Sequence, residues 1–136
     1  MKTFKLKKLE ILESVDEDII LHEIPLQDGL IINKEDEHDH WLIEAFLENT
    51  YQTFFQELAD KKDQIMLQVK ITKESNAPAT FITSIIGINE IGDYINTLFL
   101  GTIVDRQKGM VKELLRKLVE EGYQGESLIT KFKEMI

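Results

Sequence analysis

The segment "MKTFKLKKLEILE", residues 1–13, decides the fold, because its alternation of apolar and polar side chains changes parity halfway along. Phe4 and Leu6 lie on one side of an extended chain. The next two apolar residues lie on the opposite side: Leu9 and Ile11. One extra residue restores a single apolar face, so we place a β-bulge at Lys7-Lys8. Such a bulge bends a long first strand, as the closure of a β-barrel requires.

The segments that follow are typical of short antiparallel strands. "IILHEI", residues 19–24, predicts a second strand that ends at Pro25, which has no N–H to donate to a sheet. Asp28-Gly29 predicts a two-residue hairpin turn, because glycine tolerates the positive φ of a type I′ turn. A third strand is expected over residues 30–33.

The segment "WLIEAFLE", residues 41–48, is apolar at both alternating sets of positions. Leu42 and Phe46 lie on the second face, so the segment predicts a strand that is buried on both sides. The period changes in "TYQTFFQELADKK", residues 50–62, where apolar residues fall at helical spacing after Thr50, the predicted N-cap. We therefore expect a short helix after this strand.

Three further strands are predicted before the character of the sequence changes. "QIMLQVKIT", residues 64–72, alternates between apolar and polar side chains along most of its length. The segments 80–88 and 94–104 are rich in β-branched and aromatic residues and are joined by the glycine-containing "NEIGD". They predict a long hairpin.

The C-terminal segment, residues 105–136, has helical spacing. Its first helix is predicted to begin after Asp105 as the N-cap and to stop at Gly122. The apolar stripe of this helix comprises Met110, Val111, Leu114, Leu115, Leu118 and Val119. A second stripe follows the short link "YQG": Leu128, Ile129, Phe132, Met135 and Ile136. The two stripes predict an α-hairpin.

Strands that precede helices, rather than alternating with them, indicate an α+β fold. We expect an antiparallel β-barrel core of about seven strands with a short helix, followed by a C-terminal two-helix pair. The barrel core corresponds to residues 1–104 and the helix pair to residues 105–136, packed together as one structural domain.

The composition limits the classes of function. The formal net charge is −9 at pH 7, which repels phosphate backbones, so we expect no nucleic-acid partner. The sequence has no cysteine, which excludes disulfides, thiolate metal sites and cysteine nucleophiles. The N-terminus lacks the apolar run of a signal peptide, and no segment approaches the roughly 20 apolar residues of a membrane span. We therefore expect a cytoplasmic protein without a membrane partner.

Acidic residues are concentrated between Glu10 and Glu48, where thirteen Asp or Glu residues accompany a single base, Lys34. If this part of the chain forms one surface, that surface is acidic and suits cations or a basic partner. The alternative is a solvated face that keeps the protein in solution.

The densest acidic stretch is "KEDEHDHW", residues 34–41, which also holds two histidines. If the strand that follows extended backward, His38 and His40 would share one face of it. The carboxylates on that face are Asp36 and Glu44. Such a set could bind zinc or manganese. No glycine fixes a chelating turn and the calcium-loop pattern is absent, which favours a hydrated loop, so we predict neither a metal nor a cofactor.

No motif indicates a set of catalytic residues. The serines lack a Gly-x-Ser-x-Gly context, and no glycine-rich loop precedes a helix. His22 lies in an apolar strand beside Glu23, which is typical of a structural histidine. The first C-terminal helix instead carries a basic face: Arg106, Lys108, Lys112, Arg116 and Lys117. This face either pairs with acids on the same helix or contacts a protein partner or another copy of the chain.

Four stretches resemble the YwpF-like family, small uncharacterised proteins of bacteria related to Bacillus and Staphylococcus: "MKTFKL", "IPLQDGLIINKE", "WLIE" and "LLRKLVEEGYQGESL". The resemblance runs along the whole chain. It implies a β-barrel core with a C-terminal helix pair, and a barrel similar to the tube protein of type VI secretion systems. It implies no established activity, substrate or cofactor.

We expect, from these patterns, a non-enzymatic cytoplasmic interaction or assembly protein. Its barrel would be the scaffold, and its acidic loops and helix pair would be the contact surfaces for a protein partner or for self-association. The alternative is a metal-dependent enzyme or metal-binding protein that uses the loop of His38 and His40. A barrel that holds a small ligand is a third possibility.

Overall fold

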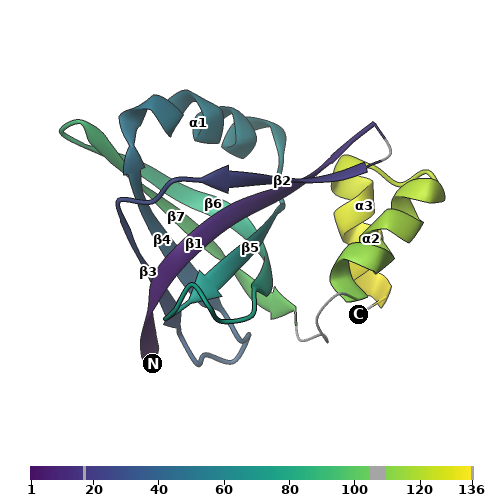
Figure 1. Cartoon of the computed structure of the whole chain (residues 1–136), viewed down its shortest axis with the longest axis horizontal. Helices are drawn as coiled ribbons and strands as arrows, with labels where there is room; N and C mark the ends of the chain where they lie inside the picture. The colour runs from purple at the N-terminus through teal and green to yellow at the C-terminus, as the bar shows by residue number, and fades with distance from the viewer. Residues whose placement is uncertain (17, 105–109, 136) are drawn as a thin grey trace.

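The structure is a computed structural model that describes residues 1–16, 18–104 and 110–135. Seven strands come first, with one helix among them, and two helices follow (Figure 1). The elements are β1 (Lys2–Val15), β2 (Asp18–Ile24), β3 (Asp28–Asn33), β4 (Trp41–Glu48), α1 (Gln52–Lys61), β5 (Ile65–Ile71), β6 (Ala79–Ile91), β7 (Tyr94–Val104), α2 (Met110–Glu120) and α3 (Gly125–Met135).

The strands form a closed antiparallel barrel with one strand outside it. The order is β2-β1-β3-β4-β7-β6-β5, and β5 also pairs with β1, which closes a ring of 6 strands and leaves β2 as an outer strand. The α+β barrel prediction is confirmed, but the expectation of about seven strands in the barrel is corrected. The seventh strand does not enter the ring, because β2 pairs only with the far half of β1.

Strand β1 is shared between three neighbours. Along one edge, residues 2–5 pair with β3 and residues 9–15 pair with β2. Along the other edge, residues 6–12 pair with β5, and the register shifts between Leu6 and Lys8. This shift confirms the predicted bulge. It places Leu6 and Leu9 in the same buried core, although they have opposite parity in the sequence.

The predicted turn at Asp28-Gly29 is wrong. Both residues begin β3, and β2 and β3 pair with different halves of β1 rather than with each other. Gly29 is needed for close approach rather than for a positive φ. A Cβ at this position would lie 2.7 Å from Leu6 Cδ2 and 3.0 Å from the Glu44 carbonyl oxygen. The β6–β7 hairpin is confirmed, and its turn uses Gly92 at a φ of 61°.

The inside of the barrel is filled by side chains. Its largest fully buried members include Phe55, Phe81 and Phe99, and the rings of Phe55 and Phe99 meet edge to face with centroids 5.9 Å apart. Phe55 comes from α1, which lies across one end of the barrel (Figure 1). Thr50 is not the N-cap as predicted: a 3-10 turn precedes the helix, and Tyr51 occupies the cap position without a side-chain hydrogen bond.

The helices α2 and α3 pack beside the barrel as the predicted pair (Figure 1). Gly122 ends α2 as predicted, with a φ of 102°, and the Tyr123 N–H donates to the Leu118 carbonyl across the turn at 3.1 Å. The predicted N-cap, Asp105, lies outside the described residues. Met135 was expected in the buried stripe of α3, but it is 47% exposed and takes no part in the buried cluster that the helices form. Ile136, the last residue of that predicted stripe, lies outside the described residues.

A second buried cluster joins the helix pair to the outside of the barrel. The outer strand β2 contributes Ile19, and the barrel contributes Met66, Ile82 and Val104. The helices contribute Leu115, Leu118, Val119, Leu128, Ile129 and Phe132. Burial of this many aliphatic side chains supplies the packing that fixes both short helices in place.

Removing the extra residue of the bulge tests the closure of the barrel. We expect deletion of Lys7 to lower the free energy of unfolding by at least about 3 kcal/mol, because one half of β1 then turns its apolar side chains outward. The matched control, Lys7→Ala, keeps the residue count and should change stability by less than about 0.5 kcal/mol. Urea denaturation followed by circular dichroism measures both. Equal stability of the two variants would contradict this account of the bulge.

Candidate functional site

The acidic loop, residues 34–40 between β3 and β4, is organised around the carboxylate of Asp36. Its Oδ1 accepts hydrogen bonds from the backbone N–H of His38 at 3.1 Å and of His40 at 2.9 Å. Its Oδ2 lies 2.9 Å from Nδ1 of the His40 ring. The Lys34 N–H donates to the His40 carbonyl at 3.0 Å, which closes the loop. The carboxylate therefore serves as an internal cap for the loop.

These hydrogen bonds lower the pKa of Asp36 below its usual value of 3.8. The largest cause is the backbone N–H of His40, because a donor directed at the carboxylate favours its charged form. The His40 ring and the His38 N–H act in the same direction, whereas desolvation opposes them.

The predicted metal ligands are only partly brought together. Asp36 and His40 are hydrogen-bonded, and the rings of His38 and His40 have centroids 5.5 Å apart. Glu44, however, lies within β4, where it pairs with Leu30 of β3 and takes no part in these contacts. In the described part of the chain, no group of three His, Asp or Glu side chains is arranged to hold a metal ion.

The outside of β3, β4, β6 and β7 carries a broad set of apolar side chains. For most of them the sequence neighbours are buried in the core, so these residues point outward. Ile86, in the register shift of β6, and Ile91, at the end of β6, are exposed by 55% and 52%. We call this set the outer apolar face: Leu30, Ile32, Leu42, Phe46, Ile86, Ile91, Tyr94, Leu98 and Leu100. None of its members belongs to the buried cluster under the helix pair, although that cluster includes Ile82 of β6 and Val104 of β7.

The strand register places these side chains in continuous rows. One row runs across three strands from Ile32 to Leu42 and then to Leu100. The row beside it runs from Leu30 to Glu44 and then to Leu98. Near the hairpin turn, the rings of Phe46 and Tyr94 have centroids 5.0 Å apart. The two rows form one apolar surface that holds the carboxylate of Glu44. In the next row Phe46 lies between Asp28 and Asn96, and Asp28 is paired with Lys5.

The prediction that β4 is buried on both sides is correct for one side only. Ile43 and Leu47 are fully buried inside the barrel, whereas Leu42 and Phe46 remain half-buried on the outside. On β5 the outer positions are mostly polar, so the sequence predicts an outer side that faces water. The exception is Met66, which is 2% exposed beneath the helix pair. Sequence periodicity identifies apolar faces but does not say which of them another element covers.

A groove of about 400 Å³ borders the outer apolar face beside α3. Ile86 and Leu100 belong to its lining, together with His40 of the acidic loop. Lys133 of α3 lines the groove as well, and its Nζ donates to Gln64 Oε1 at 3.0 Å. The groove therefore connects the acidic loop, the outer apolar face and the helix pair.

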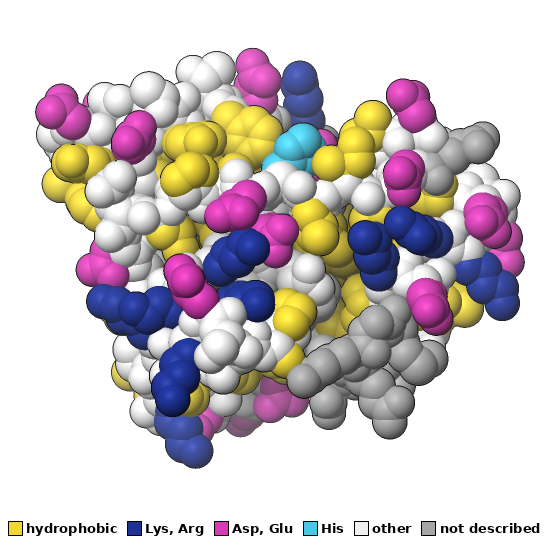
Figure 2. All heavy atoms as spheres, in the orientation of Figure 1, with side chains coloured by type: hydrophobic (Ala, Val, Ile, Leu, Met, Phe, Trp, Pro, Cys, Tyr) yellow, Lys and Arg dark blue, Asp and Glu magenta, His cyan; other side chains and the backbone are white. Residues whose placement is uncertain are grey.

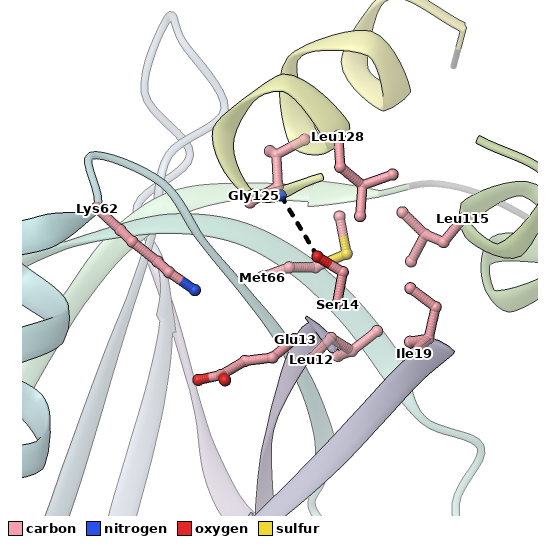
Figure 3. Close-up of a pocket in the computed structure, with 10 residues that line it drawn as sticks. Leu12, Glu13, Ser14, Ile19, Lys62, Met66, Leu115, Gly125 and Leu128 are labelled. Carbon is pink, nitrogen blue, oxygen red and sulfur yellow. Dashed lines mark hydrogen bonds between the residues drawn. The ribbon is translucent and has the colours of Figure 1, made fainter. Parts of the chain in front are cut away.

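A smaller pocket lies where the helix pair meets β1 and β2 (Figure 3). The side chains of Leu12, Ile19, Met66, Leu115 and Leu128 surround it, and the Gly125 N–H donates to Ser14 Oγ at 3.4 Å across its edge. Its volume is about 30 Å³, which is room for about one or two water molecules rather than for a substrate. This pocket is a packing feature of the junction.

The predicted basic surface is partly visible. Lys112, Arg116 and Lys117 are exposed on α2, and Figure 2 shows Lys and Arg side chains over the helix pair among acidic ones. Arg116 Nη2 lies 4.0 Å from Asp18 Oδ1 of β2, so part of this charge faces the barrel of the same chain. Arg106 and Lys108 lie outside the described residues.

A pH series tests the capping role of Asp36. At neutral pH we expect Asp36→Asn to melt at a lower temperature than the wild type, because the amide cannot supply the charge that the N–H donors stabilise. A lowered pKa stabilises the fold above pH 3.8, and this stabilisation is lost as the pH falls through the folded-state value. The difference in melting temperature should therefore disappear in acid. Asp39→Asn in the same loop is the charge-matched control, and an equal effect there would contradict the capping role.

Within residues 1–16, 18–104 and 110–135, no helix combines the length and the apolar character that crossing a membrane requires.

Comparisons with known proteins agree with the resemblance noted in the sequence. The YwpF-like protein family model matches residues 2–135. The chain is 41% identical over 137 residues to the uncharacterized protein YwpF of Bacillus subtilis (strain 168), covering 100% of both chains. The crystal structure of a hypothetical protein from Staphylococcus aureus superposes with a TM-score of 0.70 at 32% identity, covering 99% of this chain and 92% of that chain. The chain belongs to the YwpF-like protein family.

Proposed function

We propose that this chain is a non-enzymatic, cytoplasmic interaction or assembly protein. Its barrel is the scaffold, and its contact surface is the outer apolar face, flanked by the acidic loop and the helix pair. The observation that carries the proposal is the outer apolar face itself, whose rows run across β3, β4 and β7 and whose members all stay half-buried or exposed.

Two members of this face are among the exposed large apolar side chains of the described residues. Leu30 is 37% exposed and Ile86 is 55% exposed. A large contiguous apolar surface is rare on soluble proteins that act alone, and such a surface commonly marks a binding site. Binding of a partner would remove this surface from water, which contributes about 25 cal/mol per Å² of apolar area.

Another apolar patch on the outside of the sheet is covered by helices of the same chain. Ile19 is 6% exposed, Met66 2% and Ile82 6%, because α2 and α3 pack on them. The outer apolar face has side chains of the same kind but no such cover among the described residues. By analogy, a partner protein supplies it.

The two carboxyl groups with lowered pKa, Asp28 and Asp36, support a structural rather than a catalytic role for these charges. The pKa of Asp28 is lowered chiefly by a hydrogen bond from the Lys5 ammonium group, whose Nζ lies 2.9 Å from Oδ1. Asp36 is held by the amides of its own loop. Both groups are engaged locally at the surface and do not face a common cavity.

The assembly version of the proposal draws on the expected similarity to the tube protein of type VI secretion systems. If that similarity extends beyond barrel geometry, copies of this chain associate with each other. Sedimentation velocity over a range of concentrations separates this version from binding of a different protein.

Exposure-matched variants test the proposed contact surface. Leu30→Thr with Ile86→Thr alters the outer apolar face, at residues that are 37% and 55% exposed. We expect at least a tenfold loss of partner recovered by affinity capture from the native cell, because each lost contact weakens binding by about 1 kcal/mol. The control, Val15→Thr with Ile20→Thr, alters residues of β1 and β2 that are 38% and 37% exposed and should retain the partner.

Two results would contradict the proposal. One is equal recovery of partners by the wild type and by both double variants. The other is stoichiometric zinc or manganese in the purified protein that is lost in His38→Ala with His40→Ala, since it would favour the metal-dependent alternative.

A further inference from the structure

The outer apolar face is framed by negative charge at both ends. At one end lies the acidic loop with Glu35, Asp36, Glu37 and Asp39. At the other end, Glu48 pairs with Tyr94, and the hairpin turn brings Glu90 and Asp93. The positive groups nearby are fewer than the acids. Lys34 lies in the acidic loop, the N-terminal ammonium lies 3.2 Å from Glu35 Oε2, and Lys5 is paired with Asp28 at 2.9 Å. Lys133 lines the groove beside the face. The frame is therefore strongly acidic.

Glu44 places a further negative charge inside the face. Its neighbours across the strands are Leu30 and Leu98, and it is half-buried. Among the ion pairs and side-chain hydrogen bonds of the described residues, none involves the Glu44 carboxylate. When an apolar partner covers this face, the carboxylate loses water, and that loss is offset only if the partner brings a positive group.

A second copy of this chain is a poor occupant. Face-to-face packing would bring the acidic ends and the two Glu44 carboxylates close together, and like charges across an interface oppose association. The positive charges of α2 do not solve this, because acids accompany them on the helix surface. Within residues 111–120 the exposed side chains are all charged: Lys112, Glu113, Arg116, Lys117 and Glu120. The charge pattern favours a different protein.

We propose that the outer apolar face binds an amphipathic segment of a partner protein that carries Lys or Arg. Its apolar side chains cover Leu42, Leu98 and Leu100, one cation pairs with Glu44, and other cations face the acidic ends. This inference rests on the proposed function and adds the chemistry of the partner. The segment lies on the sheet as an amphipathic helix does, with its apolar stripe inward and its basic side chains at the borders.

The test uses two synthetic peptides of about 18 residues, long enough for about five helical turns. Both carry the same apolar stripe, while their polar positions are Arg and Lys in one peptide and Glu in the other. With the isotope-labelled full chain, we expect the basic peptide to shift the amide signals of β3, β4 and β7. The acidic peptide should leave them unchanged.

Charge variants then identify the role of Glu44. We expect Glu44→Gln to raise the Kd of the basic peptide about tenfold, because the cation then faces a neutral amide. Glu57→Gln on the exposed side of α1 alters the net charge equally and should leave the Kd unchanged. Raising the salt from about 50 mM to about 500 mM should weaken binding of the basic peptide.

The outcomes separate this inference from the proposed function. If the exposure-matched variants show that the face holds a native partner, but Glu44→Gln and salt have no effect on the basic peptide, the partner chemistry is overturned and the function stands. If neither a partner nor a peptide depends on the face, both are overturned. A dimer that dissociates on Leu30→Thr with Ile86→Thr would make a second copy the occupant and would also overturn the inference.

Discussion

Closure of the barrel by the pairing of β1 with β5 is the constraint on which the rest of the structure depends. One edge of β1 must pair with β5 over residues 6–12. The other edge pairs with β3 over residues 2–5 and with β2 over residues 9–15. The register shift between Leu6 and Lys8 makes this possible, since it bends β1 and still keeps its apolar side chains in one core. Gly29 completes the arrangement, because any larger residue would meet Leu6 at the bend.

The bend in β1 also decides what the outside of the barrel becomes. Its second half leaves β3 and carries β2, and β2 brings Ile19 to the apolar patch on which α2 and α3 pack. The helices are thereby directed to the side of β2 and β5, and no residue of β3 or β4 belongs to the cluster on which they pack (Figure 1). The candidate binding surface is exposed because the two C-terminal helices pack elsewhere on the sheet.

Local patterns predicted those features of the fold that have local causes. A change of parity after Leu6 requires an inserted residue, and Gly122 ends a helix wherever the helix lies, so both could be found in the sequence. Asp28-Gly29 has the pattern of a turn, but contacts with a distant strand override it. The candidate site was harder to find, because half-exposed leucines have the same sequence pattern as buried ones. The composition of the loop with His38 and His40 suggests a metal site. In the structure, however, the Asp36 carboxylate accepts hydrogen bonds from the backbone of the loop itself.

A lone carboxylate in an apolar surface changes what that surface can bind. Without Glu44, the outer apolar face would suit any apolar partner, including another copy of itself or an unfolded chain. With Glu44 between Leu30 and Leu98, each of these would leave a desolvated charge unpaired, which costs several kcal/mol. The acidic ends add repulsion between copies over a longer range. Apolar area thus supplies the affinity, and the negative charges select among partners in favour of one that is basic.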